Sequence, residues 1–190
     1  EDANEVHKIT IIPRGMAGGY TMMLPKEEKI AIATKNELLA SITGLLGGRV
    51  SEELYFGEIS TGASDDFSKA TKIARSMVTE YGMSDLGPVQ LEHKEEGVFL
   101  GRDYNKTRNF SDAVALEIDE EVRKIVNECY KKATKILKDN KDLVMLLSNT
   151  LIEKETITKE EIDELVKTGK LSSKEEKQTE NKEETIKEEK

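Results

Sequence analysis

Two adjacent carboxylates, Asp65 and Asp66, are the residues of this sequence best suited to chemistry. They lie in a stretch, residues 61–81 (TGASDDFSKATKIARSMVTEY), whose apolar residues recur at three- and four-residue steps. This spacing predicts an amphipathic helix with both aspartates in its first turn, Ser64 as its N-cap and Gly82 as its left-handed stop. Because acidic side chains suit the positive end of a helix dipole, both aspartates could simply stabilise the helix. Alternatively, one of them faces a cation across a cleft. Adjacent helical residues point about 100° apart, so we expect the two to face differently.

The other candidates for metal binding or nucleophilic catalysis are His7, His93 and Cys129. None forms a pair at ligand spacing, since the chain has no C-x-x-C and no H-x-x-x-H motif. His7 lies in a strand-like run, His93 in a polar loop, and Cys129 in a helical pattern that favours a buried, inert thiol. The sequence also lacks a G-x-S-x-G nucleophile motif and a phosphate-binding glycine loop. These residues alone therefore predict no complete active site.

The N-terminal region predicts a small β-hairpin followed by a long helix. Val6–Pro13 and Tyr20–Leu24 are rich in residues that favour strands, and glycines separate them. A helix begins after a capping box at Thr34 and keeps its apolar period as far as Gly57. The pair Gly47–Gly48 either breaks this helix or lets another backbone pack closely against it. The unbroken apolar period favours close packing.

The C-terminal half predicts three helices after a loop-rich segment. Short strands are possible within that segment at Val89–Leu91 and Val98–Leu100. A long helix is expected over Ser111–Asp139, and a second over Lys141–Leu151 after a break at Asn140. Another capping box starts a last short helix over Thr158–Val166.

Composition limits the classes of function. The net charge is −9 and no basic block precedes the last residues, so we expect no nucleic-acid partner and no direct membrane contact. No apolar run approaches the roughly 18 residues that cross a bilayer. Residues 170–190 are almost entirely polar and charged, which predicts a disordered tail after a domain over residues 1–169.

Five motifs resemble, in order along the chain, the C-terminal peptidase domain of the FtsH family. They are VHKITIIPRG (residues 6–15), GGYTMMLP (18–25), LLGGRVSEELYFGEISTGASDDFSKAT (45–71), MVTEYGMSDLGPV (77–89) and LIEKETITKEEIDELV (151–166). Members of this family are membrane-anchored, ATP-dependent zinc metalloproteases. The resemblance implies a mainly α, zincin-like peptidase domain with a small β-hairpin or sheet near the N-terminus.

The resemblance also implies a zinc site of two histidines from an H-E-x-x-H helix and one distant aspartate. That aspartate ends the family motif TGASND, which places it at Asp66. Asp65 then stands where the family commonly has Asn, and we interpret it as a solvated cap residue. No H-E-x-x-H occurs in this chain. In the family that motif precedes the VHKITIIP strand, so we expect the two histidines and the catalytic glutamate to lie upstream of Glu1. The chain by itself is then expected to be metal-free and inactive.

Further expectations rest on the resemblance alone. They are a homo-hexamer, protein substrates that are unfolded or misassembled, an ATP/Mg-binding module and membrane anchors upstream, and a location at the cytoplasmic face of the cell membrane. Val6–Pro13 would form the cleft edge on which an extended substrate pairs. Gly47–Gly48 would let its helix approach the zinc-binding helix. The alternative is a non-catalytic scaffold or oligomerisation domain of a degenerate family member. The sequence upstream of Glu1 distinguishes the two.

Overall fold

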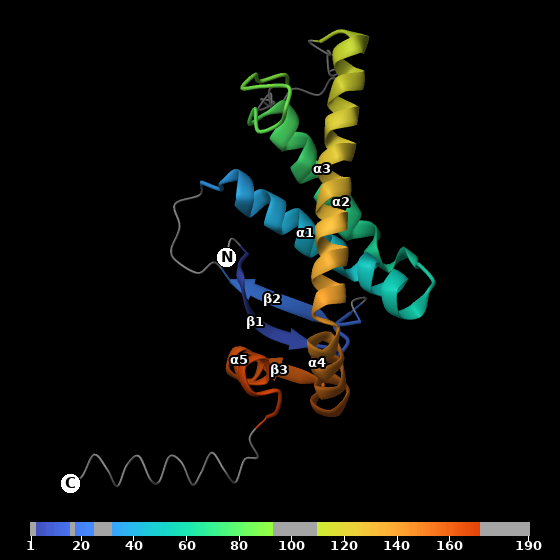
Figure 1. Ribbon diagram of the computed structural model, residues 1–190, viewed down its shortest axis with the longest axis vertical. Coiled ribbons are helices and arrows are strands. Elements are labelled where there is room, and N and C mark those ends of the chain that lie inside the picture. The colour runs from blue at the N-terminus through green and yellow to red at the C-terminus, as the bar shows by residue number, and fades with distance from the viewer. Residues whose placement is uncertain (1–2, 16–17, 25–31, 93–109, 172–190) are drawn as a thin grey trace, which may run out of the picture. The chain divides into compact units, whose positions relative to one another are not determined.

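A computed structural model describes residues 3–15, 18–24, 32–92 and 110–171 of the chain (Figure 1). Its contacts divide the chain into two units, a helical unit (residues 1–3 and 29–139) and a sheet unit (residues 4–28 and 140–190). Helices dominate the described residues and the strands form one small sheet, as expected for a mainly α fold. None of the described helices combines the length and apolar character needed to cross a membrane.

In its described residues, the helical unit consists of three α-helices and two short helical turns. They are α1 (Lys35–Ser51), the π-helical turn η1 (Glu52–Phe56), the 3-10 turn η2 (Thr61–Ala63), α2 (Ser64–Thr79) and α3 (Asp112–Asp139). Helix α1 packs against both α2 and α3, and α2 also contacts α3. The three helices therefore enclose one core.

Helix α1 begins where the sequence predicts, and the helical run of α1 and η1 ends at the predicted Gly57. Thr34 and Glu37 form the expected capping box, in which the Thr34 amide donates to the Glu37 carboxylate at 2.8 Å. The helix runs unbroken through Gly47–Gly48, continues as η1 and ends at Gly57, whose φ is +73°. A Cβ added at either member of the glycine pair would meet nothing within 4 Å among the described residues. The described part of the chain therefore does not need glycine there, and close packing of a further helix stays a prediction.

The core of the helical unit is apolar and includes buried alanines on α2. Its fully buried members come from all three helices: Ile42 and Leu46 on α1, Ala70, Ala74 and Met77 on α2, and Ile118 on α3. Interiors pack at the density of organic crystals, so these side chains together hold α2 against α1 and α3. This packing sets the direction of the helix that carries both aspartates.

Of three local predictions for this unit, two are wrong and the left-handed conformation of Gly82 is confirmed. Ser64 is not the N-cap of α2, because the 3-10 turn η2 precedes it and Ser60 caps that turn instead. Gly82 is left-handed as predicted, with φ +59°, although α2 already ends at Thr79. Val89–Leu91 forms no strand, because the Leu91 amide donates to the Thr79 carbonyl at the end of α2 instead. The strand expected at Val98–Leu100 lies outside the described residues.

The sheet unit contains a three-stranded antiparallel sheet in the order β2-β1-β3, with β1 at Glu5–Thr10, β2 at Tyr20–Leu24 and β3 at Thr156–Thr158. The predicted hairpin of β1 and β2 is confirmed, whereas β3 was not foreseen. Because β1 lies between two strands, the expectation that its edge receives a substrate strand is wrong along Lys8–Thr10, where β3 already pairs with it. The outer edge of β2 has no strand partner among the described residues.

Two helices complete the described part of the sheet unit, α4 (Lys141–Lys154) and α5 (Lys159–Thr168), which end three and two residues later than predicted. The Thr158 capping box is confirmed, with the Thr158 amide donating to Glu161 at 3.0 Å. Ile157 and Leu165 are almost completely buried and form the small core of this unit.

Candidate zinc-ligand site

Asp65 and Asp66 both lie in the first turn of α2, as the sequence predicts, and they differ in exposure. Asp65 is exposed, whereas Asp66 is half-buried. Within the described part of the chain, no hydrogen bond or ion pair engages the carboxylate of Asp66. A half-buried carboxylate without a partner at a helix start is stabilised by the helix dipole and remains available to a cation.

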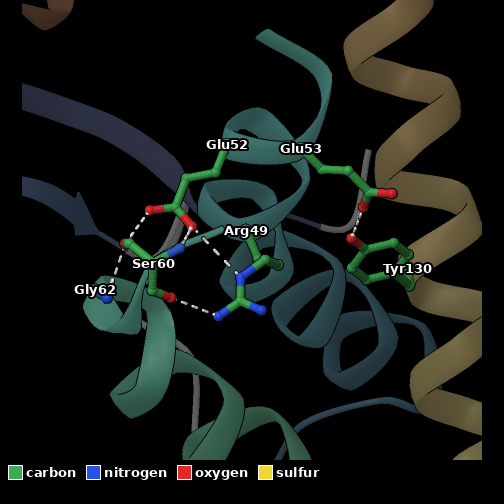
Figure 2. Close-up of polar contacts among 6 residues, drawn as sticks. All are labelled: Arg49, Glu52, Glu53, Ser60, Gly62 and Tyr130. Atoms are coloured by element: carbon green, nitrogen blue, oxygen red, sulfur yellow. Dashed lines mark hydrogen bonds and ion pairs between the residues drawn. The ribbon is translucent and has the colours of Figure 1, made fainter. Parts of the chain in front are cut away.

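The turn before α2 is held by the carboxylate of Glu52, which lies in η1 (Figure 2). That carboxylate accepts hydrogen bonds from the Ser60 backbone amide at 3.1 Å and from the Ser60 hydroxyl. The Ser60 hydroxyl oxygen in turn accepts from the Gly62 amide at 3.1 Å. A chain of bonds therefore leads from the end of α1 into the turn that starts α2. The hydrogen bonds from Ser60, together with Arg49, lower the pKa of Glu52.

Arg49 holds the same turn from a second direction (Figure 2). Its terminal nitrogen Nη2 donates to the Ser60 carbonyl at 2.8 Å, and its Nε lies 3.4 Å from a carboxylate oxygen of Glu52. The guanidinium carbon also lies 4.9 Å from the centre of the Phe67 ring, within the range of a cation–π contact. Phe67 directly follows Asp66, so Arg49 contacts the chain on both sides of the candidate ligand.

The next residue of η1, Glu53, points to a different element. Its carboxylate accepts a hydrogen bond from the Tyr130 hydroxyl on α3. Burial, followed by this contact with Glu53, raises the pKa of Tyr130. Two residues further along η1, Tyr55 donates to the Leu137 carbonyl at 3.2 Å. In this π-helical turn, the consecutive carboxylates of Glu52 and Glu53 therefore bind different elements, the turn before α2 and helix α3. Such π-helical turns are frequent at functional sites.

A shallow, open depression of about 540 Å³ lies beside this network, bordered by Arg49, Phe67 and Tyr130 among others. Glu53 and Glu58 also border it, and Asp66 does not. We therefore assign the depression no role in binding the cation.

The remaining candidate ligands are His7, Cys129 and His93. His7 lies at the irregularity in the pairing of β1, Cys129 is buried on α3, and His93 lies outside the described residues. Burial raises the pKa of the Cys129 thiol, which agrees with the inert role predicted for it. Within the described ranges, no three His, Cys, Asp or Glu residues form a group that could hold a metal. The residues present therefore fit a single zinc ligand and not a complete site.

Comparison with known proteins decides the family. The model of peptidase family M41 matches residues 1–165. The chain belongs to peptidase family M41. It is 60% identical over 169 residues to the ATP-dependent zinc metalloprotease FtsH of Acholeplasma laidlawii, covering 89% of this chain and 26% of that protein. It is 53% identical over 173 residues to the protein of the same name from Bacillus subtilis, covering 90% of this chain and 27% of that protein.

These matches confirm the resemblance drawn from the sequence motifs. The chain spans about a quarter of the length of the curated relatives it matches. The network of Arg49, Glu52 and Ser60 was not foreseen from the sequence. The spacing of Arg49 and Glu52 at i and i+3 on one helix was a signal for their ion pair, but nothing local connected either residue to Ser60.

Proposed function

We propose that this chain is the C-terminal part of the peptidase domain of an ATP-dependent zinc metalloendopeptidase, and that Asp66 supplies one zinc ligand. The main support for the proposal is that the Asp66 carboxylate is half-buried and has no partner among the described residues. Other side chains hold the helix start on which it lies. Residues 1–169 form this part of the domain, and residues 170–190 form a charged tail.

In this proposal the two remaining ligands are histidines of an H-E-x-x-H helix encoded upstream of Glu1. Two histidines four residues apart lie on one helix face, and the glutamate between them serves as general base. Zinc bound there would act as a Lewis acid and lower the pKa of a water molecule. The part of this chain is to present the Asp66 oxygen in a fixed direction and to keep that carboxylate free of competing partners. Without the histidines, the chain alone neither holds zinc tightly nor cleaves peptides.

The names of the relatives support protein substrates and dependence on ATP. We propose that the substrates are unfolded or misassembled proteins. The complete protein is a homo-hexamer anchored in the cell membrane with this domain on the cytoplasmic face, and its ATP/Mg-binding module is encoded upstream. The free edge of β2 is the part of the described sheet that suits an extended substrate, since main-chain pairing there would tolerate many sequences. Met22, Met23 and Leu24 on this strand are each about half exposed, at 43%, 52% and 42%.

The test uses both the product of the whole gene and the 190-residue chain. The gene should encode an H-E-x-x-H motif upstream of Glu1, and its product should degrade fluorescein-labelled casein only with ATP. A chelator should stop this degradation, and added zinc should restore it. The 190-residue chain, refolded in excess zinc and then dialysed, should retain no stoichiometric metal. A degenerate upstream motif with no proteolysis would favour the scaffold interpretation. One tightly held zinc ion per 190-residue chain would contradict the proposed division of the ligands.

A further inference from the structure

The start of α2 lacks the side-chain cap that normally fixes a helix start. Its N-cap position is Ala63, which has no side chain able to accept a hydrogen bond, and Ser64 does not replace it. The 3-10 turn η2 precedes the helix, and Ser60 caps that turn through the Gly62 amide. The direction of the first turn of α2 therefore depends on what holds Ser60.

Ser60 is held by two side chains, Arg49 in the last turn of α1 and Glu52 in η1. Glu52 accepts from both its amide and its hydroxyl, and Arg49 donates to its carbonyl (Figure 2). All three polar groups of one residue are thus bound by two side chains that are themselves paired at 3.4 Å. Both side chains are largely shielded, with exposed fractions of 18% for Arg49 and 25% for Glu52. Hydrogen bonds in which one partner is charged are shorter and stronger than neutral ones, so they hold Ser60 firmly in place.

We infer that Arg49 and Glu52 are positioning residues for Asp66. They hold Ser60, and through Ser60 and Phe67 they fix the turn from which the Asp66 carboxylate projects. This role rests on the proposed function, in which Asp66 binds zinc. Partners that orient a metal ligand typically change metal affinity about 10- to 100-fold when removed. Neither residue touches the metal or the substrate in this account, so neither is a catalytic residue.

The first experiment measures the turn itself in the 190-residue chain, with no metal. Amide hydrogen exchange is compared in the parent chain, in Glu52→Ala and in Glu53→Ala. The Glu53 variant is a matched control because it removes a carboxylate from the neighbouring position of η1, whose partner is Tyr130 on α3. We expect exchange at the Gly62 and Asp66 amides to be at least about tenfold faster in Glu52→Ala, with the Ala74 amide in the middle of α2 unchanged. The control should leave the Gly62 and Asp66 amides unchanged.

Conservative variants separate positioning from folding. Glu52→Gln keeps an oxygen that can accept from Ser60 but loses the attraction to Arg49, so its effect should be smaller than that of alanine. Arg49→Lys keeps the charge but cannot bind Ser60 and stack on Phe67 together, so we expect it to behave as a partial loss. If Glu52→Ala does not fold, Glu52→Gln and Arg49→Lys provide the measurement. Equal exchange at Gly62 and Asp66 in these variants and the parent would overturn the inference.

The second experiment measures zinc affinity in the product of the whole gene by competition with a chelator. Glu52→Ala should weaken zinc binding about 10- to 100-fold, Glu52→Gln should recover part of the loss, and Glu53→Ala should have no effect. Unchanged zinc affinity in a variant whose turn exchanges faster would overturn the positioning role. Asp66→Ala is measured in parallel. Full zinc affinity in Asp66→Ala would refute the proposed function, whatever the Glu52 variants show.

Discussion

Replacing Gly47 and Gly48 of α1 by alanine should stabilise the chain. Gly47 and Gly48 lie inside an unbroken helix, neither has a positive φ, and an added Cβ at either would meet nothing within 4 Å among the described residues. Alanine in a helix interior is favoured over glycine by about 0.5–1 kcal/mol, so the double variant should gain about 1–2 kcal/mol. For a chain of this size, each kcal/mol corresponds to roughly 2–4 °C in Tm.

Gly57→Ala is the matched control, because the same chemical change should have the opposite sign. Nothing lies within 4 Å of a Cβ added there either, but Gly57 ends η1 with φ +73°. An L-residue in this left-handed conformation costs about 1–2 kcal/mol, so the variant should lose that amount. Gly57 therefore differs from Gly47 and Gly48 in its backbone conformation and not in the space around an added Cβ.

The assay is urea unfolding of the 190-residue chain, followed by far-UV circular dichroism with the slope held common between variants. A loss of stability in the Gly47→Ala/Gly48→Ala variant would contradict this expectation, because it would mean that part of the same chain already packs against the glycines. In the product of the whole gene, the same double variant should hold less zinc if the proposed zinc-binding helix packs there. A gain of stability in the 190-residue chain, together with a loss of zinc from the whole protein, would indicate that the zinc-binding helix packs against Gly47–Gly48.

Three further predictions concern the core, the network and the thiol. Leu46→Ala should cost about 3–5 kcal/mol in urea unfolding, since Leu46 is 0% exposed, whereas Phe56→Ala should change stability little because Phe56 is 79% exposed. Ser60→Ala should raise the pKa of Glu52 toward its ordinary value of 4.5 in an NMR titration, since the Ser60 hydroxyl is the largest cause of the lowered value. In the parent chain, the stability contributed by Glu52 should be fully present above pH 4.5 and should be lost as the pH falls through the lower pKa of the folded state. In Ser60→Ala, the decrease of stability with falling pH should be smaller. Cys129, 3% exposed with a raised pKa, should react with a thiol reagent only at the rate of unfolding; fast reaction in the folded chain would contradict its burial.

Local signals predicted much of the fold, because they act over a few residues. The capping boxes at Thr34 and Thr158 and the break at Asn140 appear where the sequence places them. The strand β3 was missed because three residues, Thr156–Thr158, carry too little pattern to stand out between two helices. Because β3 was missed, the central position of β1 was missed too. The prediction that a substrate pairs with an edge of β1 was wrong for the same reason.

The candidate site was predictable only in part. Periodicity placed Asp65 and Asp66 in one helical turn but could not choose between them, and the choice of Asp66 came from the resemblance to a family. Ser64 was the natural choice of cap by residue type, but the 3-10 turn moved the cap back to Ser60. The contact of Ser60 with Glu52 spans eight residues and depends on the path of η1. Such contacts follow from tertiary geometry, which a local pattern does not encode.

The most direct test of the account is the zinc content of the whole gene product carrying Asp66→Asn, measured beside Asp65→Asn by atomic absorption after dialysis. Both variants replace a carboxylate by an amide of the same shape in the same turn of α2, so folding should be matched between them. We expect Asp65→Asn to retain zinc and Asp66→Asn to lose it. Zinc retained in Asp66→Asn, or lost in Asp65→Asn alone, would contradict it.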